Sequence, residues 1–228
     1  MVQHPRRAVA RVPSDEGDTA LLAADRARLI ERVSVGLAHE GKNPLHNMML
    51  HVQLMAEKIA DPGRGGSPLE RHLGSLRDGI SKVDALLRAF GEFASTENLA
   101  PDLVAALART LQLLGYEARR FNVEVSHTAP ASLLVASDAR LVNDLVGHLF
   151  VAAIELARDG GRVHVAVESQ GPRARLELRA EGGLPRRHDA QPHLDAARRL
   201  AGAAAGELSI DTSAAAGARL SLSFVHSR

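Results

Sequence analysis

The residues best suited to chemistry lie in one run, Ala38-His39-Glu40-Gly41-Lys42-Asn43-Pro44-Leu45. An exposed neutral imidazole is a nucleophile toward phosphoryl groups, and an adjacent carboxylate can orient it and take up its proton. An amide one helical turn later can position a water or a phosphoryl oxygen. On a helix that advances about 100° per residue, an apolar stripe before the run places His39 and Asn43 on the outward face. The pattern favours a phosphoacceptor about as much as a solvated histidine on a polar helix.

Two other kinds of site are excluded by the same run and its surroundings. A zinc protease helix needs a second histidine four residues after the first, and Asn43 stands there. A serine hydrolase needs a Gly-x-Ser-x-Gly elbow, which the sequence lacks. Pro44 cannot donate to the carbonyl of Glu40, so the helix is expected to bend there.

Apolar residues at helical spacing predict two long helices that carry this run. The first covers about 19–60, with Ile30, Val33 and Leu37 in its stripe, and the second covers 69–94 at four-three spacing. The breaker-rich segment 61–68 predicts the loop of an antiparallel hairpin. We expect the stripes to pack against a second copy and form the four-helix bundle of a homodimer. Packing on the rest of the same chain is the alternative.

The remainder of the chain mixes helices with alternating strands. Helices are predicted at about 102–118, 138–158 and 193–204, and strands at 122–126, 133–136, around 163–167 and 176–178, around 208–210 and 220–224. This order predicts an α+β fold, a sheet covered by helices on one side. The expected domains are therefore a flexible arm at 1–18, a helical hairpin at 19–97 and an α/β sandwich at 98–228.

Composition excludes several classes of function. The 228 residues contain no cysteine, which rules out disulfides, a thiol nucleophile and cysteine-bound metals. A net charge of +1 and 3% aromatic residues give little basis for binding nucleic acid. No apolar run is long enough to span a membrane, and the first thirty residues lack a secretory signal. We therefore expect a cytoplasmic protein that binds neither nucleic acid nor membrane, and we identify no metal site.

The run at 38–45 resembles the phosphoacceptor box of sensor histidine kinases, and the similarity extends over about 30–226. The resemblance implies that His39 is phosphorylated, that Glu40 is the acid/base that assists, and that Asn43 aligns a water when a partner is dephosphorylated. Gly41 departs from the family, which usually has a larger residue there. Because Gly41 falls on the seam side of the helical wheel, the departure is expected to affect helix packing more than chemistry.

The segment from Ser137 onward resembles the ATPase domain of those kinases, of the GHKL group, with its nucleotide equipment missing. Ala152 stands where the family has the asparagine that holds magnesium, and His148 where a second asparagine is common. The run Arg179-Ala180-Glu181-Gly182-Gly183 lacks the aspartate that reads adenine. About ten residues separate Gly183 from the predicted helix, too few for a phosphate-covering lid. The resemblance therefore implies a degenerate domain that uses no ATP.

These observations together predict a histidine phosphotransferase of two-component signalling. His39 would relay a phosphoryl group between the aspartates of response-regulator receiver domains, and the chain would need no cofactor of its own because the receiver brings Mg²⁺. The receiver is expected to dock on the outward row Lys42, His46, Leu50 and Gln53, which we call the docking row. The alternatives are a response-regulator phosphatase that uses Asn43, and a non-catalytic pseudokinase that sequesters a receiver.

Overall fold

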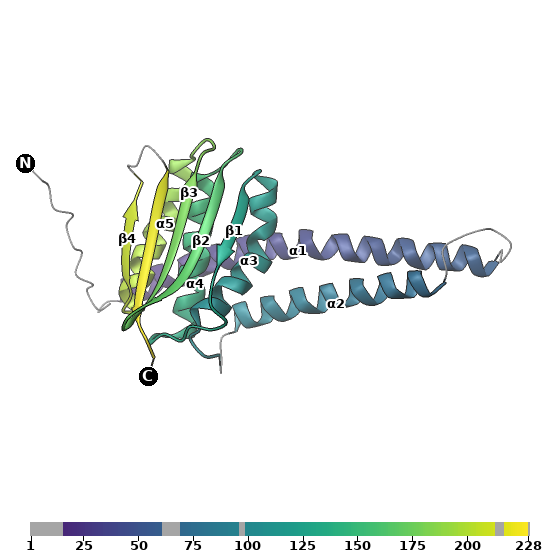
Figure 1. The fold of residues 1–228 in the computed structure, drawn as a ribbon, viewed down its shortest axis with the longest axis horizontal. Helices are drawn as coiled ribbons and strands as arrows, with labels where there is room; N and C mark the ends of the chain where they lie inside the picture. Colours follow the sequence, from purple (N-terminus) through teal and green to yellow (C-terminus); the bar gives the residue numbers. More distant parts are fainter. Residues whose placement is uncertain (1–15, 61–68, 96–98, 213–216, 228) are drawn as a thin grey trace, which may run out of the picture.

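A computed structural model describes residues 16–60, 69–95, 99–212 and 217–227. Two long helices, α1 (Glu16–Ala60) and α2 (Leu69–Ala94), run antiparallel side by side and project from the α+β part of the chain (Figure 1). The first long helix, predicted from about residue 19, therefore begins at Glu16. The predicted arm up to residue 15, the predicted loop at 61–68 and residues 96–98 lie outside the described residues.

The rest of the chain forms a mixed sheet with helices on one side. Its elements are α3 (Leu103–Arg120), β1 (Glu124–Thr128), α4 (Ala139–Leu156), β2 (Arg162–Gln170), β3 (Arg173–Glu181), α5 (Arg187–Ala203), β4 (Glu207–Asp211) and β5 (Ala218–Val225). The five strands lie in the order β1-β2-β3-β5-β4, and within it β1 and β2 pair parallel while the other neighbours pair antiparallel. The predicted α+β class is confirmed.

Local sequence explains where these helices begin. Asp102 accepts hydrogen bonds from the backbone N–H groups of Val104 and Ala105 at the start of α3. Asp138 caps α4 in the same way, through the N–H groups of Arg140 and Leu141. Such side chains satisfy donors that the first turn of a helix leaves without partners.

The predicted strand at 133–136 is wrong. Leu134 and Val135 make isolated bridges, with Asp102 and His226. The backbone N–H of Leu133 donates to the Asp102 carboxylate, and the Leu133 carbonyl accepts from Leu103. The segment is therefore tied to the start of α3 and forms no ladder along the sheet. The predicted helix at about 193 also begins earlier, at Arg187, which makes the connection from β3 still shorter.

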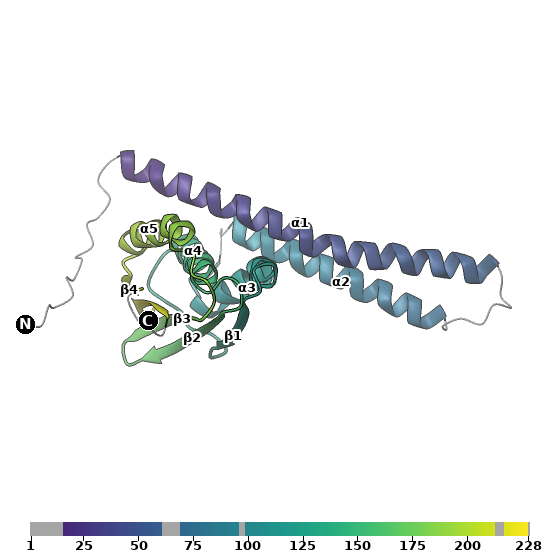
Figure 2. The same cartoon turned by 90° about the horizontal axis from the view of Figure 1, so that it is seen from above.

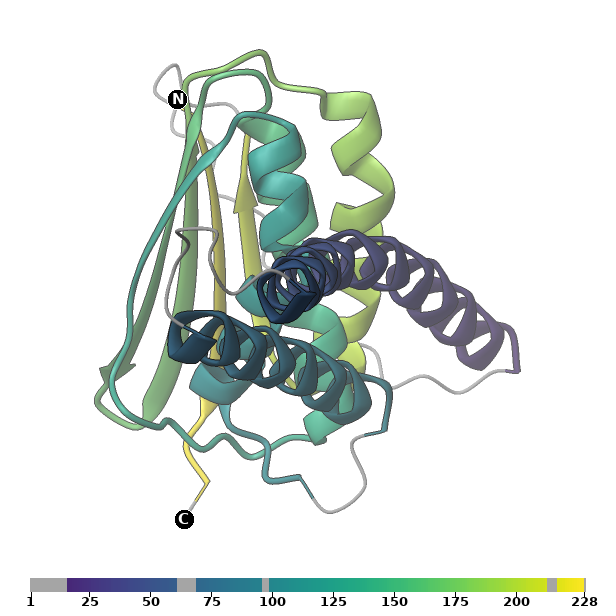
Figure 3. The ribbon, with the colours of Figure 1, turned by 90° about the vertical axis from the view of Figure 1, so that its right-hand side faces the viewer.

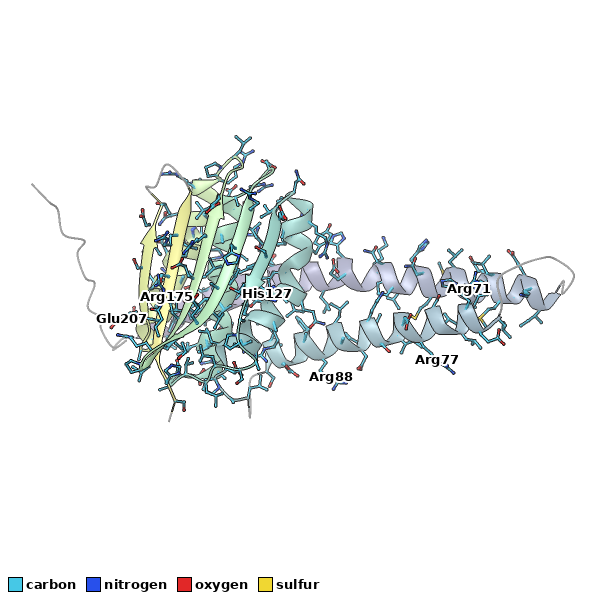
Figure 4. All side chains as sticks on the ribbon, viewed as in Figure 1. Arg71, Arg77, Arg88, His127, Arg175 and Glu207 are labelled. Atoms are coloured by element: carbon cyan, nitrogen blue, oxygen red, sulfur yellow. The ribbon has the colours of Figure 1, made fainter. Side chains whose placement is uncertain are left out.

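The two faces of the sheet differ in polarity, as strand alternation dictates. Val163, Val165 and Leu176 point into the core and are fully buried. On the opposite face, Glu177 makes ion pairs with Arg175 and Arg179, and Figure 4 shows Arg175 and Glu207 on the sheet. The sheet is thus covered on one side by α3, α4 and α5, with charged side chains on the other.

The first half of α1 forms a third layer over these helices. Figures 2 and 3 show α1 crossing the side of α3, α4 and α5 that faces away from the sheet. Leu29 and Val33 are fully buried and belong to the same apolar core as Phe93 and Leu113. This part of the predicted stripe therefore packs on its own chain. Farther along, α1 changes direction near its middle (Figure 2), and Pro44 lies inside the helix.

Buried ion pairs fix this layer in place. Arg32 of α1 donates to Glu117 of α3 at 2.7 Å and to Glu155 of α4 at 2.5 Å. Asp25, which is 1% exposed, pairs with Arg199 of α5 at 2.8 Å. Arg26 reaches Asp144 of α4 at 2.5 Å. Charged side chains thus link α1 to each of the three helices below it.

None of the helices within the described ranges is both long and apolar enough to cross a lipid bilayer.

We predict that Arg32→Leu destabilises the protein strongly. The substitution removes the cation that the buried Glu117 and Glu155 share; Glu155 retains its pair with Arg158 at 3.0 Å, whereas Glu117 loses the cation that it contacts. Breaking a buried pair in this way costs about 3–5 kcal/mol, to be measured by urea denaturation. The matched control is Arg88→Leu on α2 (Arg88 is labelled in Figure 4). Both side chains of the Arg88–Asp84 pair are exposed, and such a pair is worth about 1 kcal/mol or less. Equal losses in the two variants would contradict the prediction.

Candidate functional site

His39 lies on α1 where the helix leaves the α+β part of the molecule. Its side chain is exposed, and its imidazole ring stacks on the phenol ring of Tyr116 in α3. The ring centroids are 4.5 Å apart and the planes differ by 9°. The prediction that His39 faces outward agrees with its exposure, but one face of the ring touches another part of the chain.

The two assisting residues lie in different surroundings. Glu40 is half-buried and forms an ion pair with Arg119, one turn beyond Tyr116 on α3. Asn43 is exposed one turn after His39 on α1. The site therefore combines a reachable imidazole, a carboxylate held by a cation and an amide open to solvent. These groups suit phosphoryl transfer to and from a nitrogen nucleophile.

Sequence reasoning did not identify Tyr116 and Arg119 as part of this site. Helix α3 reaches α1 because Gly36 has no side chain: a Cβ at that position would lie 2.6 Å from the carbonyl oxygen of Leu113. The available signals were Gly36 inside an apolar helical stripe and a single tyrosine in the whole sequence. Neither shows which distant helix packs there.

The docking row is exposed along its whole length. Lys42, His46, Leu50 and Gln53 are each exposed, and Leu50 keeps 45% of its accessible surface. With about 100° per residue, these four side chains and His39 fall within about 80° of one another around the helix axis. The row is therefore a continuous surface that leads away from the imidazole.

The expectation for Gly41 changes. A Cβ at Gly41 would meet no atom within 4 Å, so a larger residue would fit without disturbing the packing of α1.

A second exposed surface of the helical pair is apolar. We call it the distal stripe. It consists of eight apolar side chains that follow His39 in the sequence and are 36–70% exposed: Leu45, Met49, Val52, Ile59, Leu69, Leu73, Ile80 and Leu87. Met48 turns toward α2 and packs against Gly79. The helical pair thus buries one seam between its own helices and leaves another uncovered.

The face of α4 that the kinase resemblance assigns to a nucleotide is closed. His148 and Ala152 are both fully buried. Nδ1 of His148 lies 2.9 Å from Nδ1 of His193 in α5, and a Cβ at the neighbouring Gly147 would lie 2.8 Å from Leu29 of α1. Ala152 offers no oxygen to a metal ion. These residues do not fit a magnesium–nucleotide group.

Burial also sets the charge of the two imidazoles. Burial lowers the pKa of His148 from its ordinary 6.5 to about 4. Burial, followed by the charges of His148 and Arg32, lowers the pKa of His193 to about 3. Nε2 of His193 lies 3.1 Å from Arg32. Both rings are therefore neutral near pH 7, where one can donate the hydrogen bond and the other accept it.

No protein-family model matches this chain. It is 35% identical over 115 residues to the two-component sensor PprA of Pseudomonas aeruginosa. This match covers 49% of this chain and 12% of that protein. It is 24% identical over 160 residues to the sensor protein CopS of Pseudomonas syringae pv. tomato, covering 67% of this chain and 32% of that protein. The chain thus spans a third or less of the length of these relatives, and it is similar to sensors of two-component systems.

Among solved structures, one described as a bacterial phosphotransferase aligns with a TM-score of 0.48 at 15% identity. The alignment covers 94% of this chain and 100% of that one.

We predict that His148→Asn flattens the pH dependence of stability. The folded pKa of about 4 lies below the ordinary 6.5, so the unfolded chain binds more protons. The contribution of this imidazole to stability is therefore fully present above pH 6.5 and is lost as the pH drops toward 4. Removing one such imidazole reduces the slope in this window by up to about 1.4 kcal/mol per pH unit, as measured by urea denaturation between pH 7.5 and 4.5.

The control for this prediction is His188→Asn, which replaces an exposed histidine of α5 and is expected to keep the wild-type slope. Parallel pH profiles for wild type and His148→Asn would mean that the buried imidazole is not held neutral.

Proposed function

We propose that this protein is a histidine phosphotransferase. A ring nitrogen of His39 attacks the phosphorus of an aspartyl phosphate on one response-regulator receiver domain. The N–P bond forms, the P–O bond to the aspartate breaks, and the carboxylate leaves. The reverse step passes the phosphoryl group to the aspartate of another receiver. The acyl phosphate supplies the free energy, so no nucleotide enters the cycle.

The observation that carries the proposal is a contrast between two surfaces. His39 is exposed on α1, whereas His148 and Ala152 on α4 are buried beneath α1 and α5. The chain therefore presents a phosphoacceptor to the outside while its α4 face is packed with its own side chains. This contrast supports transfer from a phosphorylated protein over phosphorylation by ATP.

In the proposed reaction, Glu40 orients the imidazole and takes up its proton, and Asn43 aligns a phosphoryl oxygen or a water. The receiver docks along Lys42, His46, Leu50 and Gln53 and brings its own Mg²⁺ and acidic pocket. Lys42 gives this row a positive charge beside His39, and Leu50 gives it an exposed apolar contact. The similarity to two-component sensors supports a response regulator as the partner.

The distal stripe supports a homodimer. An apolar surface that extends along two neighbouring helices favours burial against a partner, and a second copy would supply a matching stripe and complete a four-helix bundle. The pairing would leave most of the docking row uncovered, because the row and the stripe occupy different sectors around α1.

We predict that label moves from a receiver to His39 but never from ATP. Purified protein is incubated with ³²P-labelled ATP and Mg²⁺, and separately with a ³²P-phosphorylated receiver and Mg²⁺. Label is expected on the chain in the second reaction alone, and His39→Ala abolishes it because the accepting nitrogen is gone. His226→Ala, at a half-buried histidine just after β5 that contacts Ser169, is the control and keeps the label. Label from ATP would refute the proposal.

The same reactions separate the two alternatives. Faster loss of receiver phosphate with no label on the chain, surviving in His39→Ala and lost in Asn43→Ala, would identify a phosphatase. Stable binding of the receiver with no loss of its phosphate would identify a sequestering module.

We predict that Ile80→Glu converts the protein from a dimer to a monomer. Ile80 is 61% exposed in the distal stripe, and a charge there would be buried without a partner in the bundle. Sedimentation velocity at micromolar concentration measures the change in mass. Ser81→Glu adds the same charge at the neighbouring exposed position outside the stripe and should stay dimeric. A wild-type protein that sediments as a monomer would refute the homodimer.

A further inference from the structure

The His39 imidazole has an aromatic neighbour whose role the proposed transfer reaction does not define. Tyr116 of α3 is half-buried, and its ring lies parallel to the imidazole at a centroid distance of 4.5 Å. Parallel aromatic rings at this separation attract each other. Tyr116 therefore restrains rotation of the His39 side chain about its own bonds.

The geometry of the stack leaves the reactive atoms free. The lone pair of an imidazole nitrogen lies in the plane of the ring, whereas the phenol covers a face of the ring. Within the described part of the chain, no hydrogen bond to the His39 ring occupies that lone pair. A hydrogen bond accepted by this ring nitrogen would also fix the ring, but it would occupy the lone pair that must attack the phosphorus. Stacking fixes the plane and keeps the nitrogens available in the exposed side chain.

The stack belongs to a set of contacts between the same two helices. The backbones of α1 and α3 meet at Gly36 and Leu113, where an added Cβ would lie 2.6 Å from the Leu113 carbonyl oxygen. Three residues farther along each helix, His39 meets Tyr116. Next, Glu40 pairs with Arg119. The close approach at Gly36 therefore places both chemical residues of α1 against one face of α3.

We propose that Tyr116 is the positioning residue of the phosphoacceptor, holding the His39 imidazole in the plane that in-line phosphoryl transfer from a docked receiver requires. The inference rests on the proposed phosphotransfer function. Without the stack, the exposed side chain samples several rotamers, and only part of the population presents a nitrogen to the docked phosphoryl group. Fixing one side chain in advance corresponds to a rate gain of roughly threefold to tenfold.

The contact itself is tested by NMR of the full chain, without any partner. A phenol stacked on the imidazole shifts the carbon-bound ring protons of His39 upfield through its ring current. Tyr116→Phe keeps the ring and should keep this shift, whereas Tyr116→Leu should lose it. Gly36→Ala forces the helices apart at the crossing and should lose it too, with the tyrosine still present. His39 shifts that are the same in wild type and Tyr116→Leu would overturn the inference.

The positioning role is tested by single-turnover transfer from a phosphorylated receiver. In Tyr116→Leu the rate at saturating receiver should fall about threefold to tenfold, while the receiver concentration for half-maximal rate stays unchanged, because the docking row is intact. Tyr116→Phe should restore the wild-type rate. Phosphoramidate, a small donor that needs no docked geometry, should label His39 in Tyr116→Leu within about twofold of wild type. This last reaction excludes burial or loss of the imidazole as the cause.

The outcomes separate this inference from the function on which it rests. A wild-type protein that shows the ring-current shift but accepts no phosphoryl group from any receiver would refute the phosphotransferase and leave Tyr116 as a restraint on the ring. Normal transfer by Tyr116→Leu would refute the positioning role and leave the phosphotransferase standing.

Discussion

The arrangement of this molecule depends on Arg32, a cation on α1 that joins two buried carboxylates from different helices. Glu117 belongs to α3 and Glu155 to α4, and burial raises the pKa of Glu117 despite its contacts with Arg32. A buried carboxylate without a cation is costly, so Arg32 favours the register of α1 in which it reaches both Glu117 on α3 and Glu155 on α4. That register sets how far along α1 the packed segment ends, and hence where His39 leaves the core.

The packing of α1 on α4 also explains why the α4 face differs from the nucleotide-binding face that the kinase resemblance implies. A nucleotide-binding face must stay open and polar, whereas here α4 serves as a packing surface for α1. His148, with a pKa of about 4, is neutral and can bond to an equally neutral His193. Ala152 is fully buried. Residues that look like losses in the sequence are therefore residues that suit a buried helix interface.

Sequence patterns predicted the elements better than the contacts between them. Helical spacing gave the two long helices, and alternation gave the strands, because each reflects a local choice of buried face. The segment 133–136 was predicted as a strand because it is apolar, but Asp102 draws its backbone to the start of α3. The exposure of His39 followed from the helical wheel. Its contact with Tyr116 did not, because nothing local to α1 indicates which residue of α3, more than seventy positions away, faces it.

Helix α1 meets two surroundings along its 45 residues, and His39 lies at the boundary between them. Before it, Leu29 and Val33 are buried in the common core; after it, Leu45, Val52 and Ile59 are exposed. A phosphoacceptor in the buried part could not be reached, and one far along the exposed part would have no helix beside it except α2. Only near the boundary can the side chain be held by α3 and still meet a partner. The position of His39 on α1 therefore meets both requirements of the proposed transfer, a fixed orientation and an open approach.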